Sequence, residues 1–438
     1  MLNETASSRG VRPGLRSEPV GIEPQDNLHD VIQQMVAGVL DIEEATFIDD
    51  DQTLDELPAA MRSFGNLPTA RFSGRLRLNS EAAYDQLDNE FRTVRHTPVF
   101  REEKGRHVVL ALRGRIEPRP RAWWPNLLLL LLTLFSVLLV GTGLAIQEIA
   151  YTNPFRAAQI AQNLIGNLWR GLPYALAIML ILGSHELGHY FAARRHGLAV
   201  TLPYFIPLPI FSPFGTLGAF IQLRQPMRNR KALLDIGAAG PLTGLVFAIP
   251  LLFIGLANAR VAPITPGGYY EGDSLLYALA KIVTFGRFLP SDGMDVIINS
   301  SQLAWAGWTG LLVSGLNLIP IGQLDGGHII YALIGERARW LYYPLIAAML
   351  LLVFVTNVWL LWVLLLLVFG RVYATPLDMI TPLDKPRRRV GILAMIMFLL
   401  IFVPAPLTPN RVEPTRPAPA NAIHSEPINE LALLLSDQ

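Results

Sequence analysis

One apolar stretch of the sequence carries the motif HELGH, and this stretch limits what the chain can fold into. The residues before the motif, 172–184, carry no charge, and the residues after it, ARRHG, are basic. In a helix, His185 and His189 lie one turn apart, so both imidazoles leave the same face and can bind one metal ion. Glu186 lies between them, where a carboxylate can accept a proton from a metal-activated water molecule. Ionisable groups in an apolar span are costly and usually functional, so the stretch predicts a transmembrane helix with a metal site.

The composition is that of a membrane protein with soluble extensions. Of the 438 residues, 51% are hydrophobic and 16% are charged, and the mean hydropathy is +0.36, well above that of a soluble enzyme. The net charge of +1 argues against a nucleic-acid partner. The chain has no cysteine, which excludes disulfides, thiolate metal ligands and a cysteine nucleophile. A metal must therefore be held by histidine, aspartate or glutamate.

The composition changes along the chain and predicts four regions. Residues 1–25 are polar and predict a disordered tail, and we expect no secretory signal peptide because no apolar run lies near Met1. Residues 26–120 predict a cytoplasmic α+β domain, residues 121–404 a transmembrane domain with the metal site, and residues 405–438 a flexible tail.

The predicted α+β domain contains strand and helix patterns. The expected strands are residues 71–78, 97–103 and 107–114, and the expected helices are about 28–40 and a second helix that Asn79 or Ser80 caps. We find no catalytic constellation in this domain. His96 and His107 are expected to be ordinary strand or surface histidines.

The apolar spans are long enough to predict about seven transmembrane helices. Clusters of basic residues flank the spans and all fall on one side of the membrane if the chain crosses at each span, which places the N-terminus in the cytoplasm. The expected crossings are residues 126–146, 172–193, 233–258, 302–320, 342–355, 359–370 and 390–404. On the crossing at residues 233–258, Gly237, Gly240 and Gly244 predict a small-residue surface for close helix packing.

An apolar segment rich in proline, residues 198–223, follows the metal helix. Its prolines at positions 203, 207, 209 and 213 make a straight helix unfavourable. We therefore expect a re-entrant hairpin packed against the metal helix, because irregular backbone at membrane depth must be buried or line a wet cavity. An open edge of this hairpin could accept a substrate strand. The alternative is a hydrophobic lid that does not contact substrate.

The longer loop at residues 259–301 contains acidic residues and few basic ones, which suits the outside of the membrane. No metal-ligand spacing stands out in it. We expect its acidic residues Glu271, Asp273, Asp292 and Asp295 to be solvated.

Asp325 lies in a Gly-rich turn after the span at residues 302–320, and it is the only carboxylate between about residues 302 and 335. This span runs in the same direction as the metal helix, so Asp325 is expected at the depth of the two histidines and on the same side. Catalytic zinc takes three protein ligands and leaves one position for water, which makes Asp325 the expected third ligand. The alternative is an aspartate that only caps a helix.

Two further histidines lie close to these motifs. His328, three residues after Asp325, could donate a hydrogen bond to the transition state or only cap and pack. His196, in the basic end of the metal helix, is expected at the membrane interface.

HELGH in an apolar helix, followed by NLIPIGQLDGGH, resembles the site-2 protease family of intramembrane zinc metalloproteases. The resemblance covers about residues 123–375 and includes AGPLTG at residues 239–244. It is greatest to the branch of the family found in bacteria, archaea and plastids. One departure is Leu318, where many members have proline. By motif position, the resemblance implies one Zn²⁺ per chain bound by His185, His189 and Asp325, with Glu186 as general base and Asn317 holding substrate or an oxyanion.

The resemblance also implies what such a protein would do and where. We expect cleavage of a membrane-spanning protein within or near the bilayer, by a multi-pass protein of the bacterial plasma membrane. The partners would be the substrate, the lipid bilayer and a regulatory protein at the soluble domain, with no nucleic acid. We find no segment suited to an inserted PDZ domain.

Two other classes of protein remain open. A prenyl-peptide processing zinc peptidase also has HExxH in a helix, but its third ligand is a glutamate on a later helix, and the late helices here contain none. A non-catalytic metal-binding scaffold or transporter would instead have a structural site closed by a fourth protein ligand. His328 is the only nearby candidate for that ligand.

Overall fold

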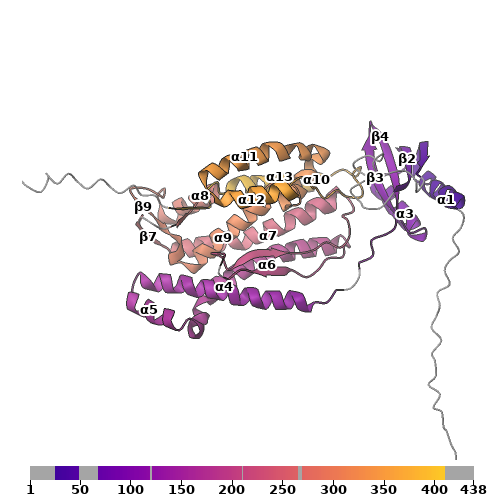
Figure 1. The fold of residues 1–438 in the computed structure, drawn as a ribbon. Coiled ribbons are helices and arrows are strands. Elements are labelled where there is room, and N and C mark those ends of the chain that lie inside the picture. Colours follow the sequence, from indigo (N-terminus) through magenta and orange to yellow (C-terminus); the bar gives the residue numbers. More distant parts are fainter. Residues whose placement is uncertain (1–24, 49–67, 119–120, 210, 265–268, 410–438) are drawn as a thin grey trace, which may run out of the picture. The chain divides into compact units, whose positions relative to one another are not determined.

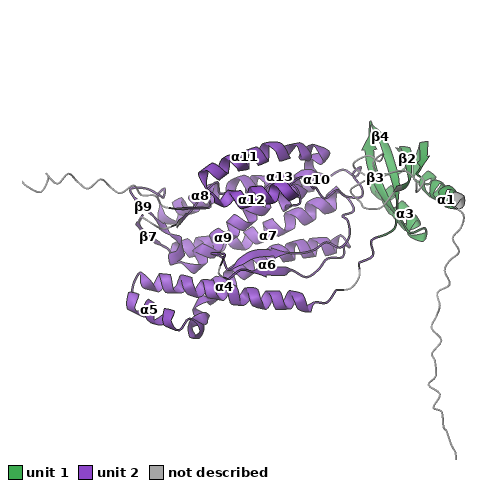
Figure 2. Cartoon of the chain, in the orientation of Figure 1, with its two compact units in different colours: residues 1–115 green, residues 116–438 purple. Residues whose placement is uncertain are grey.

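A computed structural model describes residues 25–48, 68–118, 121–209, 211–264 and 269–409 of the chain. The chain divides into two compact units, residues 1–115 and residues 116–438 (Figure 2). Of the tails expected at residues 1–25 and 405–438, residues 1–24 and 410–438 lie outside the described residues.

The N-terminal unit is a four-stranded antiparallel sheet with strand order β1-β2-β4-β3 and two described helices (Figure 1). Its elements in chain order are α1 (Gln25–Ala37), β1 (Leu40–Phe47), β2 (Pro68–Leu76), α3 (Ser80–Thr93), β3 (His96–Glu103) and β4 (Arg106–Arg113). The expected strands and helices are therefore confirmed, and β1 is an additional strand that the sequence patterns did not predict.

Local sequence explains why α3 forms where it does. The side chain of Asn79 accepts a hydrogen bond from the backbone N–H of Ala82, which satisfies one of the free donors at the helix start. Ala83, Leu87 and Phe91 recur every fourth residue and are fully buried. The expected cap is confirmed at Asn79.

The two strand histidines of this unit, His96 and His107, have structural roles. His96 is buried, with Nδ1 donating to the carbonyl of Val94 at 2.6 Å and Nε2 lying 3.0 Å from Oγ1 of Thr69. Nδ1 of His107 accepts from the backbone N–H of Leu76 at 3.1 Å. Both are therefore satisfied within the sheet, as expected for strand histidines.

The second unit is mainly helical (Figure 1). Its helices are α4 (Trp124–Ala150), α5 (Pro154–Gln162), η2 (Ile165–Gly171), α6 (Leu172–Arg195), α7 (Arg230–Ala257), α8 (Leu275–Phe285), η3 (Ile298–Ser300), α9 (Gln302–Asn317), α10 (Asp325–Ile334), η4 (Gly335–Leu341), α11 (Tyr342–Val355), α12 (Val358–Phe369) and α13 (Lys385–Ile401). Three two-stranded sheets pair β5 (Tyr204–Pro207) with β6 (Thr216–Phe220), β7 (Arg260–Pro263) with β9 (Met294–Ile297), and β8 (Tyr269–Glu271) with β10 (Leu407–Pro409).

Four helical segments in the described part of the chain are long and apolar enough to cross a membrane. They are residues 124–150, 165–195, 230–257 and 325–355. Large apolar side chains such as Leu131 and Phe135 on α4 are about half exposed, at 55% and 46%, which suits a surface that faces lipid. The molecule is therefore a mostly helical membrane protein with a small sheet domain.

The proline-rich segment forms the β5–β6 hairpin, which is fixed to two helices. From α4, Asn126 Nδ2 donates to the carbonyls of Leu202 and Pro203 at 2.8 and 3.1 Å. From α6, the hydroxyl of Tyr174 donates to the carbonyl of Phe214 at 2.8 Å. These bonds satisfy backbone groups that the irregular, proline-containing segment leaves free.

At one end of the helical unit, α8 and the strands β7 to β10 form a small layer that we call the β-cap. Lys281 on α8 is 1% exposed, and its Nζ lies 2.8 Å from Asp273 and 3.3 Å from Asp295. Asp295 is itself buried, and Glu271 accepts a hydrogen bond from the Tyr277 hydroxyl at 2.8 Å. The expectation that the acidic residues of this loop are solvated is therefore wrong for these three carboxylates, because a buried lysine and a buried tyrosine pair with them.

Candidate metal centre

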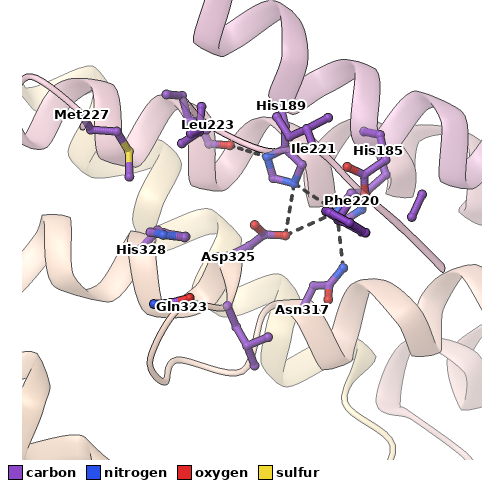
Figure 3. Close-up of a pocket in the computed structure, with 14 residues that line it drawn as sticks. His185, His189, Phe220, Ile221, Leu223, Met227, Asn317, Gln323, Asp325 and His328 are labelled. Carbon is purple, nitrogen blue, oxygen red and sulfur yellow. Dashed lines mark hydrogen bonds and ion pairs between the residues drawn. The ribbon is translucent and has the colours of Figure 1, made fainter. Parts of the chain in front are cut away.

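Two histidines from the C-terminal half of α6 and one aspartate from the first turn of α10 converge (Figure 3). Nε2 of His185 and Nε2 of His189 lie 3.1 Å apart, and Oδ2 of Asp325 lies 3.3 Å from the first and 3.2 Å from the second. Zinc bonds of 2.0 to 2.2 Å in tetrahedral geometry place neighbouring ligand atoms about 3.3 Å apart. The three atoms therefore have the spacing and the chemistry that a zinc ion requires.

The ring of His189 is oriented by a second hydrogen bond. Its Nδ1 lies 2.7 Å from the backbone carbonyl of Ile236 on α7. A carbonyl can only accept, so Nδ1 carries the proton and Nε2 keeps its lone pair directed at Asp325 and His185. This arrangement is the usual way in which a protein fixes the tautomer of a metal-binding histidine.

Three glycines of α7 allow that helix to approach the site. A Cβ on Gly240 would lie 2.0 Å from Nε2 of His189, and one on Gly244 would lie 3.3 Å from Cβ of His185. A Cβ on Gly237 would lie 2.9 Å from Cβ of His328. The small-residue surface expected on this helix is therefore present, and it faces the histidines of the two motifs.

Asp325 reaches the histidines because of the tight turn that precedes it. Asp325 is the first residue of α10, whose cap residue Leu324 makes no side-chain cap hydrogen bond. In the turn, Gly322 has a φ of +57°, a conformation that favours glycine. A Cβ on Gly326 would lie 2.0 Å from the carbonyl of Leu318. The side chain of Asp325 is thus directed at the histidines rather than used to cap its own helix.

A cavity of about 220 Å³ opens beside the three converging side chains. Hairpin residues form part of its wall, and residues of α6, α7, α9, α10 and the segments that connect them form the rest. The lining residues are His185, Glu186, His189, Ala219, Phe220, Ile221, Leu223, Met227, Ile236, Asn317, Gln323, Leu324, Asp325 and His328. All six residues singled out from the sequence therefore line one cavity.

Glu186 is 5% exposed and lies on the cavity side of α6. Its carboxylate accepts a hydrogen bond from the backbone N–H of Ile221, the residue that follows β6. The hairpin therefore helps to position the carboxylate next to the metal-binding atoms.

Asn317 and His328 approach the centre from two different helices (Figure 3). Nδ2 of Asn317, at the end of α9, lies 3.4 Å from Nε2 of His185. His328 lies on α10, three residues after Asp325, and lines the cavity without belonging to the group of three ligating atoms. Among the described residues, His185, His189 and Asp325 form the one group whose atoms could jointly hold a metal ion.

Some residues of the site were not identified from the sequence. Phe220 and Ile221 come from the proline-rich hairpin, and Gln323 lies inside the GQLDGGH motif without having been singled out. Gly240 was assigned to helix packing, although its spacing from Gly237 and Gly244 already places all three on one face of a helix. What the spacing could not indicate is that this face meets His189.

Comparisons with known proteins agree with this geometry. The model of the family described as "Peptidase family M50" matches residues 173–361. The chain is 33% identical over 241 residues to "Probable zinc metalloprotease EGY2, chloroplastic" of Arabidopsis thaliana, which covers 54% of this chain and 42% of that protein. It is 28% identical over 350 residues to the protein of the same name from Oryza sativa subsp. indica, covering 76% and 61%.

A third relative is "Probable zinc metalloprotease EGY1, chloroplastic" of Oryza sativa subsp. japonica, 31% identical over 239 residues, with 51% of this chain and 40% of that protein covered. The chain thus spans about half the length of the curated relatives it matches. No solved structure matches it.

Proposed function

Because residues 173–361 match the model of peptidase family M50, we propose that this chain is a zinc metalloprotease that hydrolyses peptide bonds of membrane-spanning proteins within or near the bilayer. The observation that carries the proposal is the convergence of Nε2 of His185, Nε2 of His189 and Oδ2 of Asp325 to within 3.3 Å of one another. The three come from two helices that are far apart in the sequence.

In this proposal, His185, His189 and Asp325 bind one Zn²⁺ per chain. When bound, zinc supplies a Lewis acid that lowers the pKa of water towards about 7 and polarises a carbonyl. The three side chains supply two neutral nitrogens and one negative oxygen, which leaves room for water and for substrate. The carbonyl of Ile236 keeps His189 in the tautomer that can bind the metal.

Glu186 acts as general base and then as general acid. Its carboxylate lies in the same cavity as the ligands and is held by the N–H of Ile221. It takes a proton from the attacking water at a carboxylate oxygen and delivers that proton to the nitrogen of the leaving amine. Such transfers typically contribute about 10² to 10⁴ in rate.

Asn317 and His328 hold the substrate or stabilise charge on it. The amide of Asn317 is 3.4 Å from a ligand nitrogen, so it can donate to the oxygen of the peptide bond that is cut. His328 is positioned by α10 on the wall of the cavity, where its ring can donate a hydrogen bond to the transition state.

The β5–β6 hairpin receives the substrate as an extended strand. Within the described residues, β6 pairs with β5 alone, and Ala219, Phe220 and Ile221 line the metal cavity. A substrate helix must unwind before it is cut, because each of its carbonyls is bonded within the helix. Strand addition to β6 would replace those lost hydrogen bonds with new ones.

The finer membrane arrangement is also part of the proposal. We propose seven crossings, with the hairpin re-entering the membrane. Exposed apolar side chains support crossings at α11 and α12, such as Phe354 at 89% and Leu361 at 61%. The basic residues at the end of α6 and at the start of α13 favour a cytoplasmic N-terminal unit. The membrane we propose is the bacterial plasma membrane. That unit would bind a regulatory partner.

The chain has no cysteine, which permits a direct test of this orientation. A single cysteine at Glu81 in the N-terminal unit, compared with one at Arg287 in the β-cap, is labelled with a maleimide that does not cross membranes. Labelling of the Arg287 position in intact cells, with protection of the Glu81 position, is the expected result. The reverse pattern contradicts the orientation.

The alternative of a non-catalytic metal scaffold or transporter has weaker support. A structural zinc site is closed by a fourth protein ligand. His328 was the candidate for that ligand, and it lies outside the group of described residues whose atoms could bind one ion together.

The proposal is tested with Glu186→Gln in the full chain. Membranes from cells that contain the active chain or this variant are compared by sequencing the new protein termini. We expect termini inside transmembrane segments only with the active chain, a cleavage rate lower by about 10² to 10⁴ in the variant, and one zinc per chain in both by elemental analysis. If the variant keeps its zinc, the lower cleavage rate results from removal of the general base and not from disruption of the metal site.

Glu148→Gln is the matched control, because Glu148 is an exposed carboxylate on α4. It should leave both cleavage and zinc content unchanged. Undiminished cleavage by Glu186→Gln would remove Glu186 as the base. Identical termini in membranes with and without the active chain would overturn the protease assignment in favour of a metal-binding scaffold.

A further inference from the structure

A second and larger cavity lies on the other side of α6 from the metal centre. It is an open groove of about 1010 Å³ between α6, α7 and the start of α13. Both α6 and α13 pack against α7 (Figure 1). The two cavities use different faces of the same turns of α6. The groove is lined by residues 184, 187, 188, 191, 192 and 195 of this helix, whereas the metal cavity is lined by residues 185, 186 and 189.

Most of the groove is apolar and open to the surroundings of the helices. Leu187 and Phe191 of α6 and Phe247 of α7 line it and are 41%, 63% and 37% exposed. Ala239 and Gly188, which has no side chain, also line it. A cavity of this kind within the apolar part of a membrane protein is filled by lipid or by another apolar group, since leaving it in contact with water is unfavourable.

One end of the groove is charged. There Arg387 of α13 donates to Asp235 of α7 and to Asp384, and Asp235 also pairs with His196 at 2.8 Å. The two carboxylates are thus already matched by the guanidinium and the imidazole. These residues connect the ends of α6, α7 and α13 into one network.

Arg195 lines the same charged end, is exposed and forms no ion pair with any residue that the structure describes. Lys385, Arg388 and Arg389 at the start of α13 are also exposed. The carboxylates that line the groove are matched, so these cations leave an excess of positive charge beside an apolar groove. An occupant that complements both the apolar lining and the positively charged end of the groove has apolar chains and a negative head group.

We propose that this groove binds one anionic glycerolipid, with its acyl chains along Leu187, Phe191 and Phe247 and its head group at Arg195. Basic pockets between transmembrane helices are the usual sites for anionic lipid head groups. A volume of about 1010 Å³ lies at the upper end of the range for small-molecule sites, which suits a ligand with two acyl chains. The site does not depend on proteolytic activity.

The lipid would stabilise the helix that carries the metal ligands. The hydroxyl oxygen of Thr243, which lines the groove, lies 3.0 Å from the carbonyl oxygen of Ser184. A Cβ on Gly188 would lie 2.3 Å from that hydroxyl oxygen. An occupant of the groove therefore covers the contact between α6 and α7 directly behind the HELGH motif.

The test is native mass spectrometry of the purified full chain with phosphatidylglycerol or phosphatidylcholine of identical acyl chains. We expect one phosphatidylglycerol per chain, bound more tightly than phosphatidylcholine. One arginine near the membrane surface contributes about 1 kcal/mol to binding of an anionic head group. Arg195→Gln should therefore weaken phosphatidylglycerol binding about fivefold. The same variant should leave phosphatidylcholine binding unchanged.

Arg194→Gln is the matched control, because Arg194 is the adjacent exposed arginine and does not line the groove. It should change phosphatidylglycerol binding less than twofold. Ala192→Phe fills the groove from α6 and should prevent binding of the lipid, while one zinc per chain reports that the variant is folded. Each of three results would overturn the proposal. The first is equal binding of the two lipids, and the second is an equal effect of Arg194→Gln and Arg195→Gln on phosphatidylglycerol binding. The third is undiminished lipid binding by an Ala192→Phe variant that contains zinc.

Discussion

A Cβ atom on Gly240 would lie 2.0 Å from Nε2 of His189. This distance is far below van der Waals contact, so α7 can pass the metal-binding face of α6 only because position 240 lacks a side chain. The same helix holds the His189 ring from the other side through the carbonyl of Ile236. The geometry of one candidate ligand is therefore set by a neighbouring helix that contributes no ligand of its own.

Gly240→Ala should displace the ring of His189 and lower the zinc content well below one per chain. Gly183→Ala is the control, because a Cβ on Gly183, also in a membrane helix, meets nothing within 4 Å. Elemental analysis of both purified variants measures the effect. Full zinc content in Gly240→Ala would mean that α7 can move away without disturbing the site.

Asp325→Asn should reduce zinc affinity strongly, because it replaces the only negative ligand with a neutral and weaker one. Asp292→Asn, at an exposed position of the β-cap, should leave affinity unchanged. The measurement is zinc titration of the metal-free protein after treatment with a chelator. Equal affinities for Asp325→Asn and the unchanged chain would remove Asp325 from the ligand set.

Asn317→Leu should slow peptide-bond cleavage about 10² to 10³-fold while one zinc remains bound, because loss of a donor to a developing oxyanion typically has this effect. The paired measurement of cleavage rate and zinc content distinguishes this role from a structural one. If zinc is lost together with activity, Asn317 supports the ligand His185 rather than the substrate.

Lys281→Met should destabilise the β-cap by about 3 kcal/mol, because it leaves Asp273 and Asp295 without their partner in a buried position. Asp273 keeps some exposure to solvent, so the lower part of the range for buried ion pairs is expected. Arg287→Met, at an exposed position of the same region, is the control. The midpoint of thermal unfolding in detergent reports the difference.

The β-cap should lose stability as pH rises from about 5 to about 8. Burial raises the pKa of Glu271 to about 8, although the Tyr277 hydroxyl donates to it and Lys281 favours its charged form; the carboxylate of Asp295 opposes ionisation. Between these pH values the folded chain keeps a proton on Glu271 that the unfolded chain releases, so each step up in pH favours unfolding. Above pH 8, Glu271 is ionised in both the folded and the unfolded chain, so the stability of the β-cap stops falling.

Glu271→Gln keeps an acceptor for Tyr277 and removes the titration. Unfolding midpoints of the unchanged chain should therefore fall between pH 5 and 8 more steeply than those of this variant. Parallel pH profiles for the two proteins would show that Glu271 is ionised in the folded β-cap at neutral pH.

The sequence by itself determined the local parts of this protein. Histidines four residues apart share one face of any helix, and an asparagine before a helix caps it, so the pairing of His185 with His189 and the start of α3 at Asn79 follow from neighbouring residues. Long apolar runs identified α4, α6 and α7 as membrane helices for the same reason, because hydrophobic length needs no partner.

Only the tertiary structure decided which distant groups meet. Asp325 was expected beside the histidines from topology, but the distances of 3.2 and 3.3 Å depend on the glycine turn before α10 and on the approach of α7 at Gly240. The acidic residues of the β-cap were expected in solvent, and Lys281 instead pairs with two of them in a buried position. Burial and pairing of charge depend on contacts between residues far apart in the chain, whereas periodicity within a single segment reports only which residues share a face.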